Sequence, residues 1–285
     1  MTSAVRAGSD IGFRSELAAR LALIGGKMAL ERFEGAQVYW KGDDSMVTNA
    51  DLEIQSWLAD EITEAFPDDG ILGEEGLAPG PSRTDAPYVW VLDPVDGTNN
   101  FGRGMPGFSV SVGIFRDGYP AAGAVYDPLG DQLFKASEGS GAWCNGRPIK
   151  AAPTPLSARS LFTIRTPWPD GVPPWVEGWM RRYRLRRVGS TALHLCYVAL
   201  GALAFVHDHG ASLWDIAGAA PIVLESGGRL TTPDGRSLFP VDPRFYRGAA
   251  MEMLAGDPAA HTEAIRDICS ATARGLRPSG APGNL

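Results

Sequence analysis

The chain has 285 residues, of which 44% are hydrophobic, so it can bury a sizeable core as one large α/β domain or two small ones. Its formal charge of -7 and its pI near 5.2 argue against nucleic acid or an anionic membrane as the main partner, because both select basic surfaces. Its three cysteines are odd in number and far apart, which indicates neither a disulfide framework nor a zinc site.

The N-terminal region lacks the unbroken apolar core of a signal peptide. Charged residues interrupt it at Arg14, Glu16, Arg20 and Lys27. The longest apolar run, residues 197–206, is about half the length that spans a bilayer, and a buried helix explains it better. We therefore expect a cytoplasmic protein without a membrane partner.

Apolar residues recur at helical spacing over residues 17–28 and 54–62, which predicts two amphipathic helices near the N-terminus. Each helix needs a sheet or another helix to cover. The Pro-Asp-Asp-Gly turn at 67–70 ends the second helix, and residues 71–73 follow as a short strand.

A compact apolar run at 88–92 predicts a buried strand that delivers Asp93 at its C-terminal end, where the active sites of α/β proteins usually lie. Residues 108–143 contain several short β-like segments, with turns at 127–131 and 145–146. The middle of the chain is therefore predicted to be a mostly antiparallel sheet.

Two further helices are predicted at 191–205 and 214–225, and Pro221 must kink or shorten the second of them. A last helix begins with Asp257 as its cap. The Gly/Pro/Ser-rich tail, residues 271–285, is expected to be disordered. No internal repeat and no clear interdomain linker is present.

The most informative segment, DPVDGTNNF, begins at Asp93. Two carboxylates, Asp93 and Asp96, bracket a proline turn, which can aim both side chains and the Val95 carbonyl at one point. Hard cations such as Mg²⁺ select oxygen ligands of this kind. Gly97 and Thr98 can present backbone N–H groups to a phosphate. The alternative is that Asp-Pro and Asp-Gly are ordinary turn pairs, with Asp96 as a helix cap.

Four other segments accompany it along the chain: VTNAD at 47–51, GEE at 73–75, WDIAG at 214–218 and ESGG at 225–228. Each alone has an ordinary explanation, such as a solvated acidic pair or a helix start. Together with the nine-residue segment, they resemble the motifs of the inositol monophosphatase family, whose members are Mg²⁺-dependent and lithium-sensitive phosphatases. The resemblance runs from about residue 15 to residue 230.

The resemblance implies an α/β fold, an α+β layered sandwich in which layers of helices and sheets alternate. Residues 1–150 would form an N-terminal α+β half that carries the metal-binding motifs. Residues 151–270 would form a C-terminal α/β half that completes the active site, so that both belong to one catalytic domain. The resemblance also implies a homodimer.

The family's site residues transfer to matching positions of this chain. The resemblance implies two or three Mg²⁺ ions, bound by Glu74, Asp93, Val95, Asp96 and Asp215. It implies catalytic roles for Glu74, Thr98 and Asp51, of which the first two would orient the attacking water. It implies substrate contacts from Val95, Asp96, Gly97, Thr98, Gly189, Ser190, Thr191, Asp208 and Asp215.

Other features leave alternatives open. Lys41 resembles a basic residue of a loop over the family's site, and a solvated lysine is an equal alternative. The Pro/Trp-rich and Arg-rich segment 166–187 is either a variable surface region or a contact surface for a second subunit or a more anionic substrate. His207 and His209 belong to no metal-ligand pattern.

The predicted function is Mg²⁺-dependent hydrolysis of a small phosphomonoester by an activated water. A polyol phosphate, first of all inositol monophosphate, suits the hydrogen-bond acceptor at Asp208. Histidinol phosphate is the second candidate. A catalytically silent metal-binding or phosphate-binding protein is the alternative of another class, and the intact carboxylate set argues against it because such a cluster repels itself.

Overall fold

Helices and sheets alternate through the molecule. The computed structural model describes residues 3–42, 46–76, 86–169 and 171–273. The helices are α1 (Ser3–Arg32), α2 (Asn49–Ala65), α3 (Thr98–Phe101), α4 (Pro174–Arg182), α5 (Thr191–Ala199), α6 (Leu213–Ala217), α7 (Ala220–Glu225) and α8 (Pro258–Ala273), with a short 3-10 helix at Phe33–Gly35.

Two large sheets carry most of the strands. The first has the order β3-β4-β5-β6-β7-β8-β9, in which β3 and β4 are parallel and the other pairs are antiparallel. The second has the order β11-β10-β12-β14-β13, with β10 parallel to both of its neighbours. A small β1-β2 ribbon lies beside α3. The strands are β1 (Val38–Trp40), β2 (Met46–Thr48), β3 (Gly70–Gly73), β4 (Val89–Asp96), β5 (Ser109–Arg116), β6 (Tyr119–Asp127), β7 (Gln132–Ser137), β8 (Ala142–Cys144), β9 (Arg147–Ile149), β10 (Leu161–Ile164), β11 (Arg184–Leu185), β12 (Phe205–Ala211), β13 (Arg229–Thr231) and β14 (Met251–Gly256).

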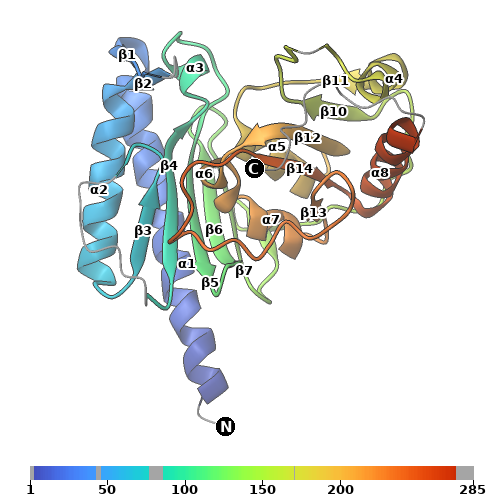
Figure 1. Cartoon of the computed structure of the whole chain (residues 1–285). Helices are drawn as coiled ribbons and strands as arrows, with labels where there is room; N and C mark the ends of the chain where they lie inside the picture. Colours follow the sequence, from blue (N-terminus) through green and yellow to red (C-terminus); the bar gives the residue numbers. More distant parts are fainter. Residues whose placement is uncertain (1–2, 43–45, 77–85, 170, 274–285) are drawn as a thin grey trace.

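The layers follow from which faces are apolar (Figure 1). Helices α1 and α2 cover one face of the seven-stranded sheet, and their buried residues Leu21 and Ile54 pack in the same core as Trp90 of β4. Helices α5, α6 and α7 lie between the two sheets. Helices α4 and α8 cover the outer face of the five-stranded sheet, where Trp179 packs on Phe205. The predicted layered α/β sandwich is therefore confirmed.

Four local predictions from the N-terminal half, two helices and two strands, are confirmed. The helices over 17–28 and 54–62 are parts of α1 and α2. The strand at 71–73 is β3, and the apolar run at 88–92 lies in β4, which extends through Asp96. Within the described ranges, no helix is both long and apolar enough to cross a membrane.

The helix predicted at 191–205 is too long. Helix α5 ends at Ala199, because Gly201 adopts a left-handed conformation with φ of +79°. The apolar run continues from Phe205 as strand β12, buried between β10 and β14. The apolar run thus belongs partly to a strand and not to one buried helix.

The helix predicted at 214–225 is two short helices, α6 and α7, and the break falls before Pro221. Pro221 lies in the first turn of α7, where its missing N–H costs nothing. Asp257 does cap the last helix, since its side chain accepts from the N–H groups of Ala259 and Ala260. That helix runs through Ala273, so the first residues of the predicted tail are helical, and residues 274–285 lie outside the described part.

Candidate active site

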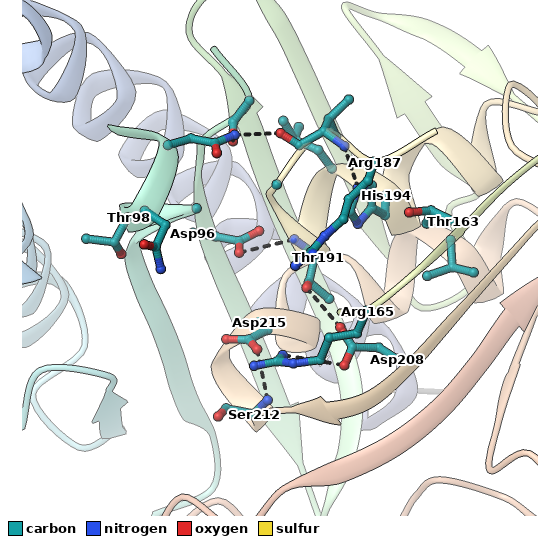
Figure 2. Close-up of a pocket in the computed structure, with 18 of the residues that line it drawn as sticks. Asp96, Thr98, Thr163, Arg165, Arg187, Thr191, His194, Asp208, Ser212 and Asp215 are labelled. Atoms are coloured by element: carbon teal, nitrogen blue, oxygen red, sulfur yellow. Dashed lines mark hydrogen bonds and ion pairs between the residues drawn. The ribbon is translucent and has the colours of Figure 1, made fainter. Parts of the chain in front are cut away.

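A cleft of about 1440 Å³ opens where the ends of β4, β10 and β12 meet helices α3, α5 and α6 (Figure 2). The predicted site residues that line it are Glu74, Asp96, Gly97, Thr98, Gly189, Thr191, Asp208 and Asp215. The other predicted site residues are buried beside these, namely Asp51, Asp93, Val95 and Ser190. Motifs that lie far apart in the sequence therefore meet at one place.

Parallel pairing of β3 and β4 brings the first two acidic segments together. Gly73 pairs with Leu92, and the Glu74 N–H donates to the Leu92 carbonyl at 3.2 Å. Glu74 and Asp93 therefore leave the same edge of the sheet side by side. A residue that sequence analysis missed, Gln55 of α2, fixes the segment after β3, because its side chain accepts from the Glu75 N–H at 3.0 Å and donates to the Gly76 carbonyl at 3.2 Å.

The turn after β4 is shaped by Gly97, which has φ of +98°. A Cβ atom at this position would lie 2.7 Å from the carbonyl oxygen of Gly107. The strand pairing of β4 with β5 is interrupted between Asp93 and Asp96, which lets the two carboxylates leave the regular pleat. The sequence requires glycine here because both the conformation and the space exclude a side chain.

Gly97→Ala is expected to lower the free energy of unfolding by about 3 kcal/mol, since it adds a clash to left-handed backbone strain. Gly104 is a matched control, because it also has a positive φ of +65° but a Cβ there would meet nothing within 4 Å. Gly104→Ala should cost only about 1 kcal/mol. Urea denaturation of both variants measures the difference, and equal losses would contradict this account of the turn.

Thr98 begins α3 and links two of the motifs. Its hydroxyl donates to the Val95 carbonyl at 2.9 Å and lies 3.4 Å from Oδ1 of Asp51. Asp51 is buried at the start of α2, where its other oxygen accepts from the Thr48 N–H at 2.8 Å and from the Thr48 hydroxyl. Asp51 therefore completes the capping box of α2 and lies next to the Thr98 hydroxyl.

Asp96 connects the seven-stranded sheet to α5. Its carboxylate accepts from the Ala192 N–H at 2.6 Å, from the Thr191 N–H at 3.2 Å and from the Ser190 hydroxyl. The Ser190 hydroxyl also accepts from the Leu193 N–H and thereby caps α5. Ser190 thus faces Asp96 and the helix, and it is fully buried.

Figure 2 shows Asp215 near Asp96, and Asp208 farther from Thr98, next to the side chain of Arg165. Asp215 belongs to the first turn of α6 and accepts from the Ser212 N–H at 2.9 Å. Asp208 lies on β12, where it accepts from the Gly210 N–H at 2.9 Å and from the Thr191 hydroxyl at 3.3 Å. Nη1 of Arg165, a residue that sequence analysis did not single out, lies 3.4 Å from Asp208.

The acidic side chains of the cleft raise one another's pKa. Burial first and then Asp215 raise the pKa of Glu74 to about 8. Burial and then Asp96 raise the pKa of Asp215 to about 7. Burial raises the pKa of Asp93 well above its usual range, with Glu74 as the next cause. Burial also raises the pKa of Asp51 and of Asp96 to about 6, although hydrogen bonds to both carboxylates oppose the effect.

The donor set fits a hard divalent cation, because several carboxylates converge in a largely buried place and the nearby cations Lys41 and Arg165 do not offset the rise in the pKa of Glu74 and Asp215. In the described part of the chain, no three Asp, Glu, His or Cys side chains stand close enough to enclose a metal as they are. Asp93, Asp96 and Asp215 instead accept hydrogen bonds from nearby N–H groups. To bind a cation, these side chains would thus have to give up some of the hydrogen bonds from N–H groups and turn toward the ion.

The structure also shows where three features lie for which the sequence left alternatives open. Lys41 lines the cleft and forms an ion pair with Glu75 at 2.7 Å, so it is not a solvated lysine. His207 is fully buried, and its Nε2 lies 3.1 Å from Glu252. The stretch 166–187 contains α4 and β11, and among its arginines Arg187 lines the cleft.

Comparison with known proteins identifies relatives over most of the chain. The model of the inositol monophosphatase family matches residues 14–273. Inositol monophosphatase 1 of Solanum lycopersicum is 38% identical over 218 residues, which cover 71% of this chain and 77% of the relative. Fructose-1,6-bisphosphatase/inositol-1-monophosphatase of Thermotoga maritima is 35% identical over 196 residues, covering 68% of this chain and 74% of the relative. The structure of inositol monophosphatase from Anabaena (Nostoc) superimposes with a TM-score of 0.77 at 27% identity, over 95% of this chain and 98% of that one.

Proposed function

Because this chain belongs to the inositol monophosphatase family and is a phosphatase that hydrolyses phosphomonoesters, we propose that its substrate is a small polyol phosphate, with inositol monophosphate as the first candidate. The observation that carries this proposal is the meeting of Glu74, Asp93, Asp96 and Asp215 beside Thr98 in one cleft. The substrate must be inferred from the residues of the site and not from family membership alone, since one Thermotoga relative is named for two phosphatase activities.

The family is generally metal-dependent, and we propose two or three Mg²⁺ ions for this chain. The ligands would be the carboxylates of Glu74, Asp93, Asp96 and Asp215 and the carbonyl of Val95. When bound, Mg²⁺ would neutralise the acidic cluster and the negative charge on the phosphate and its leaving oxygen. The carboxylates raise one another's pKa, and this supports the proposal because a bound cation would offset the repulsion between their negative charges.

Thr98 and Glu74 are proposed to orient the attacking water. The Thr98 hydroxyl donates its proton to the Val95 carbonyl, so its oxygen is left to accept a hydrogen bond from water. Asp51, next to that hydroxyl, has a pKa of about 6 and can take up a proton near neutral pH. The N–H groups of Gly97 and Thr98, at the cleft wall, would hold the phosphate oxygens.

The organic part of the substrate is proposed to lie along Gly189, Thr191 and Asp208, which line the same cleft. Asp208 would accept a hydrogen bond from a substrate hydroxyl. Histidinol phosphate fits this wall less well, because Arg165 lies 3.4 Å from Asp208 and would repel a cationic group. A homodimer in the cytoplasm remains part of the proposal, and the free thiols of all three cysteines suit a reducing compartment.

The test is phosphate release by the purified chain from myo-inositol 1-phosphate and histidinol phosphate, with Mg²⁺ and with EDTA. We expect hydrolysis of inositol phosphate that requires Mg²⁺ and exceeds that of histidinol phosphate. If the chain hydrolyses neither compound, the substrate proposal is overturned. Tight binding of phosphate without turnover would favour a silent binding protein. Light scattering of the same sample tests the dimer.

A further inference from the structure

One histidine lines the cleft and has no role in the site described so far. His194 lies on α5 one turn after Thr191, and 6% of the residue is exposed. Its Nε2 accepts a hydrogen bond from the Val188 N–H at 3.0 Å, which Figure 2 draws as a dashed line. Val188 is itself fixed, since its carbonyl accepts from the Asn100 side chain at 2.6 Å. The orientation of the imidazole ring is therefore set by a backbone segment that is held in place.

The hydrogen bond from Val188 decides which ring nitrogen of His194 carries the proton. A backbone N–H can only donate, so Nε2 must be unprotonated, and in the neutral ring the hydrogen then lies on Nδ1. Burial first and then the Arg187 guanidinium lower the pKa of His194 to about 4, while Asp208 opposes this effect. The ring is therefore neutral near pH 7, and Nδ1–H is its hydrogen-bond donor.

This donor is open to the cleft. Within the part of the chain that the structure describes, Nδ1 of His194 has no hydrogen-bond partner. The Nδ1 atoms of His207, His209 and His261 also lack a partner, but they are shut off from solvent, whereas Nδ1 of His194 is not. Because His194 lines the cleft, the open side of its Nδ1–H group is the cleft. A molecule bound there would leave this donor unpaired unless it offered an acceptor, and an unpaired buried donor costs about 1 to 3 kcal/mol.

We propose that His194 determines specificity by donating a hydrogen bond from Nδ1 to a hydroxyl oxygen of the substrate, while Asp208 accepts from another hydroxyl of the same molecule. A hydroxyl suits both positions because it donates and accepts. The inference rests on the proposed function and narrows its substrate class to phosphates that carry at least two free hydroxyls. A substrate without hydroxyls would leave the His194 donor and the Asp208 carboxylate without substrate partners, and a site of this kind rejects such an analogue.

The test compares two substrates with the same ring, myo-inositol 1-phosphate and cyclohexyl phosphate, of which the second has no free hydroxyl. We expect wild type to have the higher kcat/KM for inositol phosphate. His194→Phe should lower the ratio of the two kcat/KM values about fivefold, mainly through a higher KM for inositol phosphate, because one hydrogen bond is removed. The ratio does not depend on the amount of folded enzyme, so partial misfolding does not imitate the effect.

His261→Phe is the matched control. His261 is also buried, with a pKa lowered to about 4 and Nε2 at 2.9 Å from the Thr231 hydroxyl, but it does not line the cleft. Two smaller changes separate contact with the substrate from support of Val188. The amide of His194→Asn lies near the position of Nδ1, whereas the amide of His194→Gln reaches the position of Nε2. We expect His194→Asn to keep most of the preference and His194→Gln to lose as much as His194→Phe.

Three results would overturn this role of His194: no preference in wild type, an unchanged ratio in His194→Phe, or an equal fall in His261→Phe. A preference kept in His194→Gln and lost in His194→Asn would also overturn it, because the residue would then act only by holding Val188. Each of these results can occur while Mg²⁺-dependent hydrolysis of myo-inositol 1-phosphate persists, and the proposed function would then stand. If wild type hydrolyses neither compound, the proposed function itself fails.

Discussion

Asp93→Asn is expected to lower kcat by about 10³-fold or more, with little loss of folded protein. Asp93 is 1% exposed and lies within β4, where the pairing with β5 begins to be interrupted. Its pKa is raised by burial and then by Glu74, Asp96 and Asp215, so the other acidic groups of the cleft all act on it. Asparagine keeps the size of the side chain and removes the charge that a cation would need. Steady-state phosphate release in the presence of Mg²⁺ measures the loss.

Two controls accompany Asp93→Asn. Asp60→Asn removes a charge from the exposed side of α2 and should leave kcat unchanged. In EDTA, thermal unfolding of Asp93→Asn should occur at a temperature no lower than that of wild type, because the substitution removes like-charge repulsion within the cluster. Wild-type kcat in Asp93→Asn, or unfolding of that variant at a clearly lower temperature, would contradict its assignment as a metal ligand.

The sequence predicted those parts of the site in which the functional residues lie on, or directly after, neighbouring strands. Glu74 follows β3 and Asp93 lies within β4, and the parallel pairing of these strands places them together without help from distant residues. The spacing of motifs along the chain was therefore sufficient for the acidic side of the cleft. The predicted turns at 127–131 and 145–146 were also informative, because they divide the middle of the chain into the antiparallel strands β5 to β9.

Isolated residues of the cleft carried no such signal. Gln55 lies in the middle of α2 among ordinary helix residues, and only the tertiary structure brings it to the Glu75 N–H. Arg165 follows a short apolar strand, and its ion pair with Asp208 joins residues 43 positions apart. The apolar run at 197–206 was misread because helix and strand look alike in a buried segment, and Gly201 was the signal that separates them.

Mg²⁺ is expected to stabilise the protein more at alkaline pH than at acid pH. The side chains of Asp51, Asp96, Asp215 and Glu74 have ordinary pKa values of 3.8 to 4.5, and folding raises these to values from about 6 to about 8. Between about pH 4 and pH 8, the folded state without Mg²⁺ thus binds more protons than the unfolded state. Its stability therefore falls as the pH rises through this window.

Bound Mg²⁺ reverses this loss, because the ligands must be ionised to bind it and its affinity rises with pH. At a Mg²⁺ concentration of about 100 times Kd, the free energy of unfolding should increase by about 2.7 kcal/mol, which corresponds to a rise in Tm of roughly 5 to 10 °C. We expect this rise near pH 8 and little of it near pH 5, measured by calorimetry against EDTA at matched ionic strength. In Asp93→Asn the rise should shrink at both pH values. An equal rise at both pH values in wild type, or a larger one near pH 5, would mean that these carboxylates do not bind the ion.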